Sequence, residues 1–178
     1  MTCASLISDK HCLIDTSIDT YFRNFHESLP LLEQDKLRMG FENTVYVTDA
    51  HSATLLLSVF LVTHLCSTPA TGNGDGDEVY HFVKSMFFLL QGQALTVELL
   101  QIGLLLVTWE HSQALHQDAW LSIGTCVRIG NVLGLHRCVR RLNHEDGSEK
   151  GDWDRMRSLW WCIVLLERYV HLLELILC

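Results

Sequence analysis

Hydrophobic residues recur at three- and four-residue spacings along much of the chain, which is the period of an amphipathic helix. Residues 94–110 carry the clearest stripe, at spacings of four, three, four and three: Leu95, Leu99, Ile102, Leu106 and Trp109. Residues 116–133 repeat these spacings with Ala119, Ile123, Cys126, Gly130 and Leu133. From Asp152 onward the stripe is Leu159, Ile163, Leu166, Val170, Leu173 and Leu177. The pattern therefore predicts three long helices in the second half of the chain.

The first half of the chain predicts further helices, over 14–26, 49–66 and 79–90, with a short helical turn at 31–37. Residues 40–48 contain Val45, Tyr46 and Val47, which fit either a short extended stretch or a distorted loop. Two polar segments, 67–77 and 137–151, predict loops. This organisation gives an N-terminal tail over 1–13 and one domain over 14–178.

The helices over 94–110 and 116–133 are separated by only a few residues, and short connections make antiparallel neighbours. Gly124 and Gly130 lie inside the second of them. Glycine costs about 1 kcal/mol in a helix interior, and close approach of a neighbouring helix is the usual compensation. Gly134 stands where a left-handed C-terminal residue is expected. We therefore expect a packed hairpin with the last helix lying across it, in an all-α array of antiparallel helical hairpins.

Composition narrows the class of protein. The chain has 178 residues, of which 48% are hydrophobic, so it suits one folded domain and not a disordered segment. Lys and Arg number 13 against 21 Asp and Glu, for a net charge of −8, which disfavours phosphate binding. The longest apolar runs are shorter than the ~20 residues of a membrane-spanning helix, and no signal peptide opens the chain. These features predict a soluble intracellular protein.

No pattern of catalytic or metal-binding residues stands out. The seven cysteines include no Cys-x-x-Cys pair, so they predict buried reduced thiols and no zinc site. His111 and His116 flank a short acidic stretch, but at five residues apart they would diverge on one helix and are expected at a helix–helix turn. Hydrolase, phosphate-loop and dinucleotide motifs are absent from the sequence. We therefore expect no enzyme, cofactor or metal in this chain.

One stretch, from Ala119 to Arg137, has an identifiable pattern: Ala-Trp, then Gly-x-Cys-x-Arg ending at Arg128, then Leu-Gly-Leu-His-Arg. It resembles the signature helix of the fungal-specific transcription factor domain, the middle homology region of zinc-cluster regulators, in which Cys126 is more often Ala. The same family has Leu-Trp-Trp farther on and then an acidic-Arg pair, as here, with Asp more usual at position 167. The matching residues are Trp120, Gly124, Arg128, Gly134, Leu135, His136, Arg137, Trp160, Trp161, Glu167 and Arg168.

These residues are expected to be structural. The three tryptophans offer large apolar areas that favour burial. Arg128 and Arg168 are charges in apolar helices, so we expect Glu167 or Glu110 to pair with one of them. His136 is expected to be a hydrogen-bonded core histidine. Arg137 belongs to a basic cluster with Arg140 and Arg141, which is expected to be a solvated loop near a helix C-terminus.

The resemblance implies a regulatory domain of a nuclear transcription factor that is incomplete at its C-terminus. Family members bind DNA through a six-cysteine zinc cluster, which Cys3 and Cys12 cannot form. DNA and zinc would then belong to a module absent from this chain. The resemblance is compatible with a homodimer, contacts with the transcription machinery or a small effector, and with no membrane partner. The alternatives are an all-helical protein-interaction scaffold unrelated to transcription and, third, an all-helical enzyme.

Overall fold

The computed structural model describes residues 3–43, 49–65, 75–138 and 150–177. All regular structure in these ranges is α-helical, which confirms the predicted fold class. The helices are α1 (Cys3–Asn24), α2 (Gln34–Asn43), α3 (Ala50–Leu65), α4 (Asp75–Gln91), α5 (Val97–Ser112), α6 (His116–Val132), α7 (Leu135–Cys138) and α8 (Lys150–Leu177).

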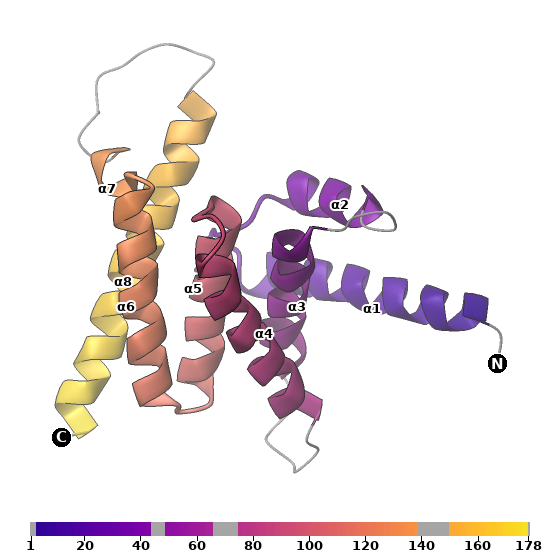
Figure 1. Ribbon diagram of the computed structural model, residues 1–178, viewed down its shortest axis with the longest axis horizontal. Helices are drawn as coiled ribbons and strands as arrows, with labels where there is room; N and C mark the ends of the chain where they lie inside the picture. The colour runs from indigo at the N-terminus through magenta and orange to yellow at the C-terminus, as the bar shows by residue number, and fades with distance from the viewer. Residues whose placement is uncertain (1–2, 44–48, 66–74, 139–149, 178) are drawn as a thin grey trace.

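Helix α5 occupies the middle of the molecule, between α3 and α4 on one side and α6 and α8 on the other (Figure 1). Its sequence is apolar around most of its circumference, and such a helix is stable only when it is covered on several sides. Eleven of its sixteen residues are buried, including Gln101, Gly103 and Glu110. The single stripe predicted for this segment was therefore too narrow, because residues between the stripe positions also face neighbouring helices.

The ends of α5 and α6 form the predicted hairpin. Thr96 caps α5 by accepting a hydrogen bond from the Leu99 amide at 3.2 Å. Residues 113–115 connect the two helices, and Ala114 adopts a positive φ of 57° in this turn. After α6, Gly134 has a φ of +74°, as predicted for the left-handed residue that ends a helix.

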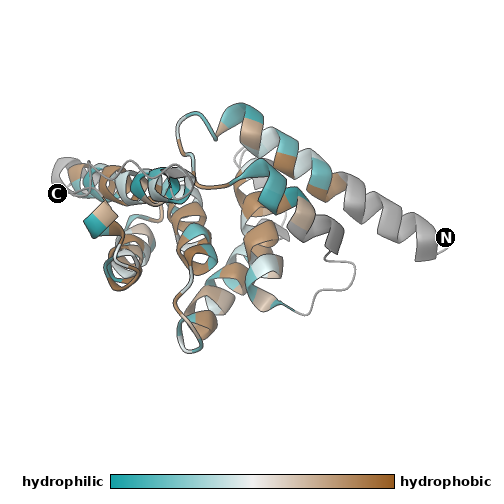
Figure 2. Cartoon of the chain, turned by 90° about the horizontal axis from the view of Figure 1, so that it is seen from above, coloured by the Kyte–Doolittle hydropathy of each residue, from teal (hydrophilic) through white to brown (hydrophobic). Residues whose placement is uncertain are grey.

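Helix α8 lies along α6 in the opposite direction. Near one end Gly130 of α6 contacts Trp160 and Ile163 of α8, and near the other end Trp120 lies beside His171. Helices α6 and α8 therefore form one edge of the molecule, opposite the edge where α1 begins (Figure 1). Hydrophobic residues are concentrated on the helices that lie between these two edges (Figure 2). This arrangement confirms the expectation of a hairpin crossed by the last helix.

Several predicted boundaries were wrong. Helix α1 begins at Cys3, so most of the expected tail over 1–13 is helical. Helix α2 extends to Asn43, into the segment that fitted either a strand or a loop, and residues 44–48 lie outside the described residues. Helices α4 and α8 begin at Asp75 and Lys150, and α7 ends at Cys138, so described helices extend into both segments that were predicted as loops. Hydrophobic spacing does not show where a helix begins or ends when its first and last turns are polar.

Candidate functional site

The residues that carry the family pattern lie at the junction of α6, α7 and α8. Gly130 lies at its centre: a Cβ there would be 2.7 Å from Ile163 Cδ1 and 3.5 Å from Trp160 Cζ3. Leu135, the first residue of α7, is fully buried and would be 3.7 Å from the same Cβ. The glycine therefore permits α8 to lie against α6 more closely than any larger residue would.

The two glycines inside α6 are not equivalent, however. A Cβ built on Gly124 would meet no atom within 4 Å. The expected close approach of a neighbouring helix is thus confirmed at Gly130 and wrong at Gly124. Gly103 of α5 is the other tight position, because a Cβ there would be 2.5 Å from Cys126 Sγ and 2.8 Å from the Phe87 ring.

His136 lies beside Trp160, with 5.9 Å between the ring centroids. The side chain is partly buried, but its Nδ1 has no hydrogen-bond partner among the described residues. The expected role as a hydrogen-bonded core histidine is therefore wrong for this nitrogen. The imidazole instead packs against the indole with the two ring planes tilted by 59°, which places it between α7 and α8. Arg137, next along α7, is exposed as expected, whereas Arg140 and Arg141 lie outside the described residues.

Two of the three motif tryptophans are not core residues. Trp160 is partly buried, but Trp120 is 43% and Trp161 is 50% exposed. The burial expected for these two indoles is therefore wrong. The reason is the helical period: α8 turns Leu159, Cys162 and Ile163 inward, so position 161 faces away from the core.

The expected ion pairs of the motif arginines are also wrong. Arg128 and Arg168 are both exposed, and neither forms an ion pair within the described ranges. Each lies about half a turn away from the buried stripe of its helix, in contact with water, so burial imposes no need for a partner. Glu167 is half-buried and likewise forms no ion pair in the described part of the chain. Glu110 is buried, but its partner is Lys84.

A buried ionic cluster links α4, α5 and α6. Lys84 Nζ donates hydrogen bonds to Glu110 Oε1 at 2.9 Å, to Tyr80 Oη at 2.8 Å, and to Asp118. The Tyr80 hydroxyl also donates to Glu110 Oε1, at 3.1 Å, and the Tyr80 ring stacks on Trp109 with 4.3 Å between centroids. Glu110 is completely buried, whereas Asp118 remains partly exposed. The ammonium group therefore neutralises a carboxylate that has no access to water.

Burial and pairing act against each other on the pKa values of this cluster. Burial raises the pKa of Glu110, and the nearby Lys84 only partly lowers it again. For Lys84, burial lowers the pKa, but the hydrogen bonds to Asp118, Tyr80 and Glu110 outweigh it and the net pKa is raised. Burial likewise raises the pKa of Tyr80, to about 12. The spacing of charged residues alone did not predict this cluster, although Glu110 was conspicuous as a carboxylate next to the apolar stripe of α5.

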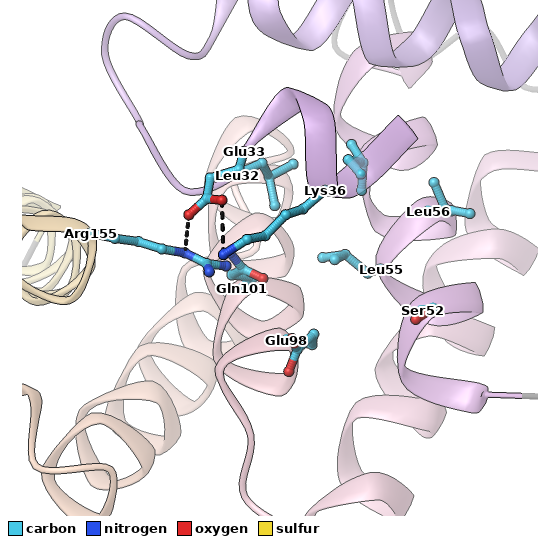
Figure 3. Close-up of a pocket in the computed structure, with 10 residues that line it drawn as sticks. Leu32, Glu33, Lys36, Ser52, Leu55, Leu56, Glu98, Gln101 and Arg155 are labelled. Atoms are coloured by element: carbon cyan, nitrogen blue, oxygen red, sulfur yellow. Dashed lines mark ion pairs between the residues drawn. The ribbon is translucent and has the colours of Figure 1, made fainter. Parts of the chain in front are cut away.

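A shallow groove opens between α2, α3, α5 and the start of α8 (Figure 3). The Glu33 carboxylate bridges Lys36 and Arg155, with N–O distances of 3.0 Å to each, and so joins α2 to α8. Gln101, which is nearly fully buried, donates to the backbone oxygen of Leu31 at 2.5 Å at the groove's inner end. The groove holds about 120 Å³, which is below the roughly 300–1,000 Å³ of typical small-molecule sites.

His111 and His116 lie at the turn between α5 and α6, as predicted, and their ring centroids are 6.2 Å apart. Among the described residues no group of three or more His, Cys, Asp or Glu side chains is placed to hold a metal ion. Cys126 and Cys162 are buried free thiols, and Cys138 is buried as well, as expected for these three cysteines. None of the described helices is both long enough and apolar enough to cross a membrane.

The sequence matches a known family over nearly all of this fold. The sequence model of the family described as "Fungal specific transcription factor domain" matches residues 18–173, which run from α1 to α8. No solved structure matches the chain significantly.

Three curated relatives are similar to the chain. Transcription factor BOA15 of Botryotinia fuckeliana is 31% identical over 124 residues, 69% of this chain and 68% of that protein. Transcription factor tazR of Aspergillus terreus is 31% identical over 79 residues, 44% of this chain and 12% of that protein. Lactose regulatory protein LAC9 of Kluyveromyces lactis is 25% identical over 154 residues, 84% of this chain and 16% of that protein. The similarity thus spans most of the first relative but less than a fifth of the other two.

Proposed function

Because the chain belongs to the fungal specific transcription factor domain family and so has a regulatory role in transcription, we propose that it acts in the nucleus by altering the output of a DNA-binding module and does not itself contact DNA. The observation that carries this proposal is the extent of the family match. The match covers the α5–α6 hairpin, the short helix α7 and most of α8, which packs on the hairpin. Most of the described helices therefore lie in the part of the chain that matches the family.

The charge of the chain supports the proposal that a separate module binds DNA. With a net charge of −8, the chain repels the phosphate backbone at long range. In the proposal, DNA contact and zinc belong to a separate zinc-cluster module, as the family resemblance implies. The domain described here contributes through contacts with that module or with other proteins.

The chemistry of the described residues supports a non-catalytic role. The most polar part of the interior is the Lys84–Glu110–Asp118 cluster, and its charges are engaged in holding three helices together. The groove at Glu33 is smaller than usual effector sites, and its Glu33, Lys36 and Arg155 side chains are paired with one another. We therefore assign regulation to protein–protein contact, in preference to catalysis or to a small effector.

A reporter assay tests this function. The chain is fused to a heterologous DNA-binding module in fungal cells, and expression of a reporter with that module's target sites is compared with expression under the module alone. The fusion is expected to change reporter expression several-fold. A Gly130→Trp variant should abolish the change, because the indole cannot fit against Ile163 and α8 is displaced.

Gly124→Ala is the matched control, since its added methyl group meets open space. This variant should keep the response of the unmodified fusion at equal protein levels. If the module alone, the fusion and both variants gave the same expression, the proposed function would be wrong.

A further inference from the structure

The outer surface of α6 and α8 presents large apolar side chains that the fold does not bury. We call this surface the α6–α8 outer face; its apolar residues, 43–69% exposed, are Trp120, Leu121, Val132, Trp161, Leu165 and Leu172. The face includes the two motif tryptophans whose burial was expected from sequence. Residues that a sequence pattern marks and the core does not use are candidates for contact with another molecule.

The exposed apolar residues are spread along the length of both helices. Because α6 and α8 are antiparallel, Val132 lies toward the same end as Trp161, and Trp120 toward the same end as Leu172. On α8 the exposed positions 161, 165, 168 and 172 follow spacings of four, three and four. This is the spacing with which one helix packs along another. The edge of the molecule formed by α6 and α8 thus presents a ridge suited to a further helix.

The size of the apolar area supports an interface. A half-exposed large side chain presents on the order of 100 Å², so the six residues together expose roughly 600 Å². The largest apolar patch of a typical monomeric protein is about 300–600 Å² and is often functional. The α6–α8 outer face is at the upper end of that range.

The charges on the face are opposite in sign to the net charge of the chain. Arg128 and Arg168 lie between the two contacts that join α6 to α8, and both are exposed without an ion pair in the described ranges. The carboxylate nearest in sequence, Glu167, is half-buried on the flank of α8. Two arginines in the middle of an apolar face, on a chain with a net charge of −8, favour an acidic partner.

We propose that the α6–α8 outer face binds an acidic amphipathic helix of another protein, with leucine-like side chains against the face and carboxylates against Arg128 and Arg168. An amphipathic helix binds an apolar surface of this kind through side chains at three- and four-residue spacings along one of its sides. The inference rests on the proposed function and deepens it, because it names the surface through which regulation by protein contact occurs.

Fluorescence anisotropy with two synthetic peptides tests the proposal. Both peptides carry leucines at spacings of four and three on a helical sequence; the remaining positions are glutamate-rich in one and lysine-rich in the other. The full chain is expected to bind the acidic peptide and to bind the basic one at least about tenfold more weakly, since the arginines repel lysine. Leu165→Ser should weaken binding of the acidic peptide by about tenfold, as for loss of a central contact.

Two further variants sharpen the test. The double variant Arg128→Glu and Arg168→Glu should shift the preference toward the basic peptide. Phe88→Ser is the control, because Phe88 is similarly exposed but lies on α4, and it should leave the affinity unchanged. Thermal melting of each variant establishes that it is folded before binding is compared.

Failure to bind the acidic peptide, or equal binding of both peptides, would overturn the proposal. So would a concentration-dependent dimer in sedimentation that Leu165→Ser dissociates, because the face would then belong to a second copy of the chain. The reporter response of the fusion is measured independently. If that response persists while the acidic peptide does not bind, the proposed function stands and only this assignment of the surface falls.

Discussion

Gly103 and Gly124 lie on neighbouring helices in opposite surroundings. A methyl group on Gly103 would overlap Cys126 and the Phe87 ring, both buried, whereas one on Gly124 would meet nothing. Replacing a helix-interior glycine by alanine gains about 1 kcal/mol in helix propensity at either site. Helix propensity is therefore the same at the two sites, and the space available for a Cβ atom differs. Only Gly103 is required by the packing of its surroundings.

We predict that Gly124→Ala raises the free energy of unfolding by about 0.5–1 kcal/mol. Gly103→Ala should lower it instead, because forcing a methyl group into a packed core costs about 1–3 kcal/mol and exceeds the gain in propensity. Urea unfolding followed by circular dichroism measures both. Equal shifts of the two midpoints in the same direction would show that α4, α5 and α6 are not packed as described.

Within the described ranges, Lys84 is the cation that pairs with the buried Glu110 carboxylate. We predict that Lys84→Met lowers the free energy of unfolding by about 3 kcal/mol, the lower end of the cost of breaking a buried ion pair, because Glu110 can take up a proton. Lys36→Met is the matched control: its pair with Glu33 is largely exposed, so its loss should cost less than about 1 kcal/mol. Indistinguishable unfolding curves for the two variants would contradict the buried location of the cluster.

At the scale of elements, the two adjacent tryptophans of α8 show how this helix is rotated about its axis. Trp160 packs on Gly130 and beside His136, whereas Trp161 faces outward. Trp160→Ala should cost about 2 kcal/mol, less than the roughly 3–5 of a fully buried aromatic. Trp161→Ala should change the free energy of unfolding by less than about 1 kcal/mol. Thermal melting of the two variants measures the difference, and a larger effect at position 161 would mean that α8 is rotated about its axis.

The sequence predicted the helices and their hairpin because apolar spacing and a single left-handed glycine are local signals. It also predicted close approach of a neighbouring helix at Gly130, but it predicted the same at Gly124, where it does not occur. It did not predict which face of α8 carries Trp161, because a tryptophan favours burial in any sequence, while the actual face depends on which stripe of α8 the hairpin covers. The pairing of Glu110 with Lys84, 26 residues away along the chain, also depends on tertiary structure.

At the scale of the whole molecule, the buried ionisable groups connect stability to alkaline pH. Burial raises the pKa of the Cys162 thiol from 9.0 to about 11, and it raises the pKa of Cys126 further. The pKa of Tyr80 is raised to about 12 and that of Lys84 is also raised. In each case the folded chain holds its proton more tightly than the unfolded chain does. The stability linked to these protons is present below the unfolded pKa and is lost as the pH rises toward the folded one.

We therefore predict that the free energy of unfolding falls steadily between pH 9 and 11, under reducing conditions. The first part of the fall comes from Cys162 and Cys126, whose unfolded thiols ionise first. Urea unfolding at a series of pH values measures it, and Cys162→Ala should make the curve shallower near pH 9 to 11. A flat pH profile in the unmodified chain would show that these thiols are open to water.

The packing of α8 on the hairpin depends most on the close contact between α6 and α8 at Gly130. Nuclear Overhauser effects measured on methyl-labelled protein test it directly, since they arise only between protons a few ångströms apart. We predict a strong cross-peak between the α-protons of Gly130 and the δ1 methyl group of Ile163, whose carbon lies 2.7 Å from where a Cβ on Gly130 would be. Assigned resonances of both groups with no cross-peak between them would contradict the packing of α8 on the hairpin.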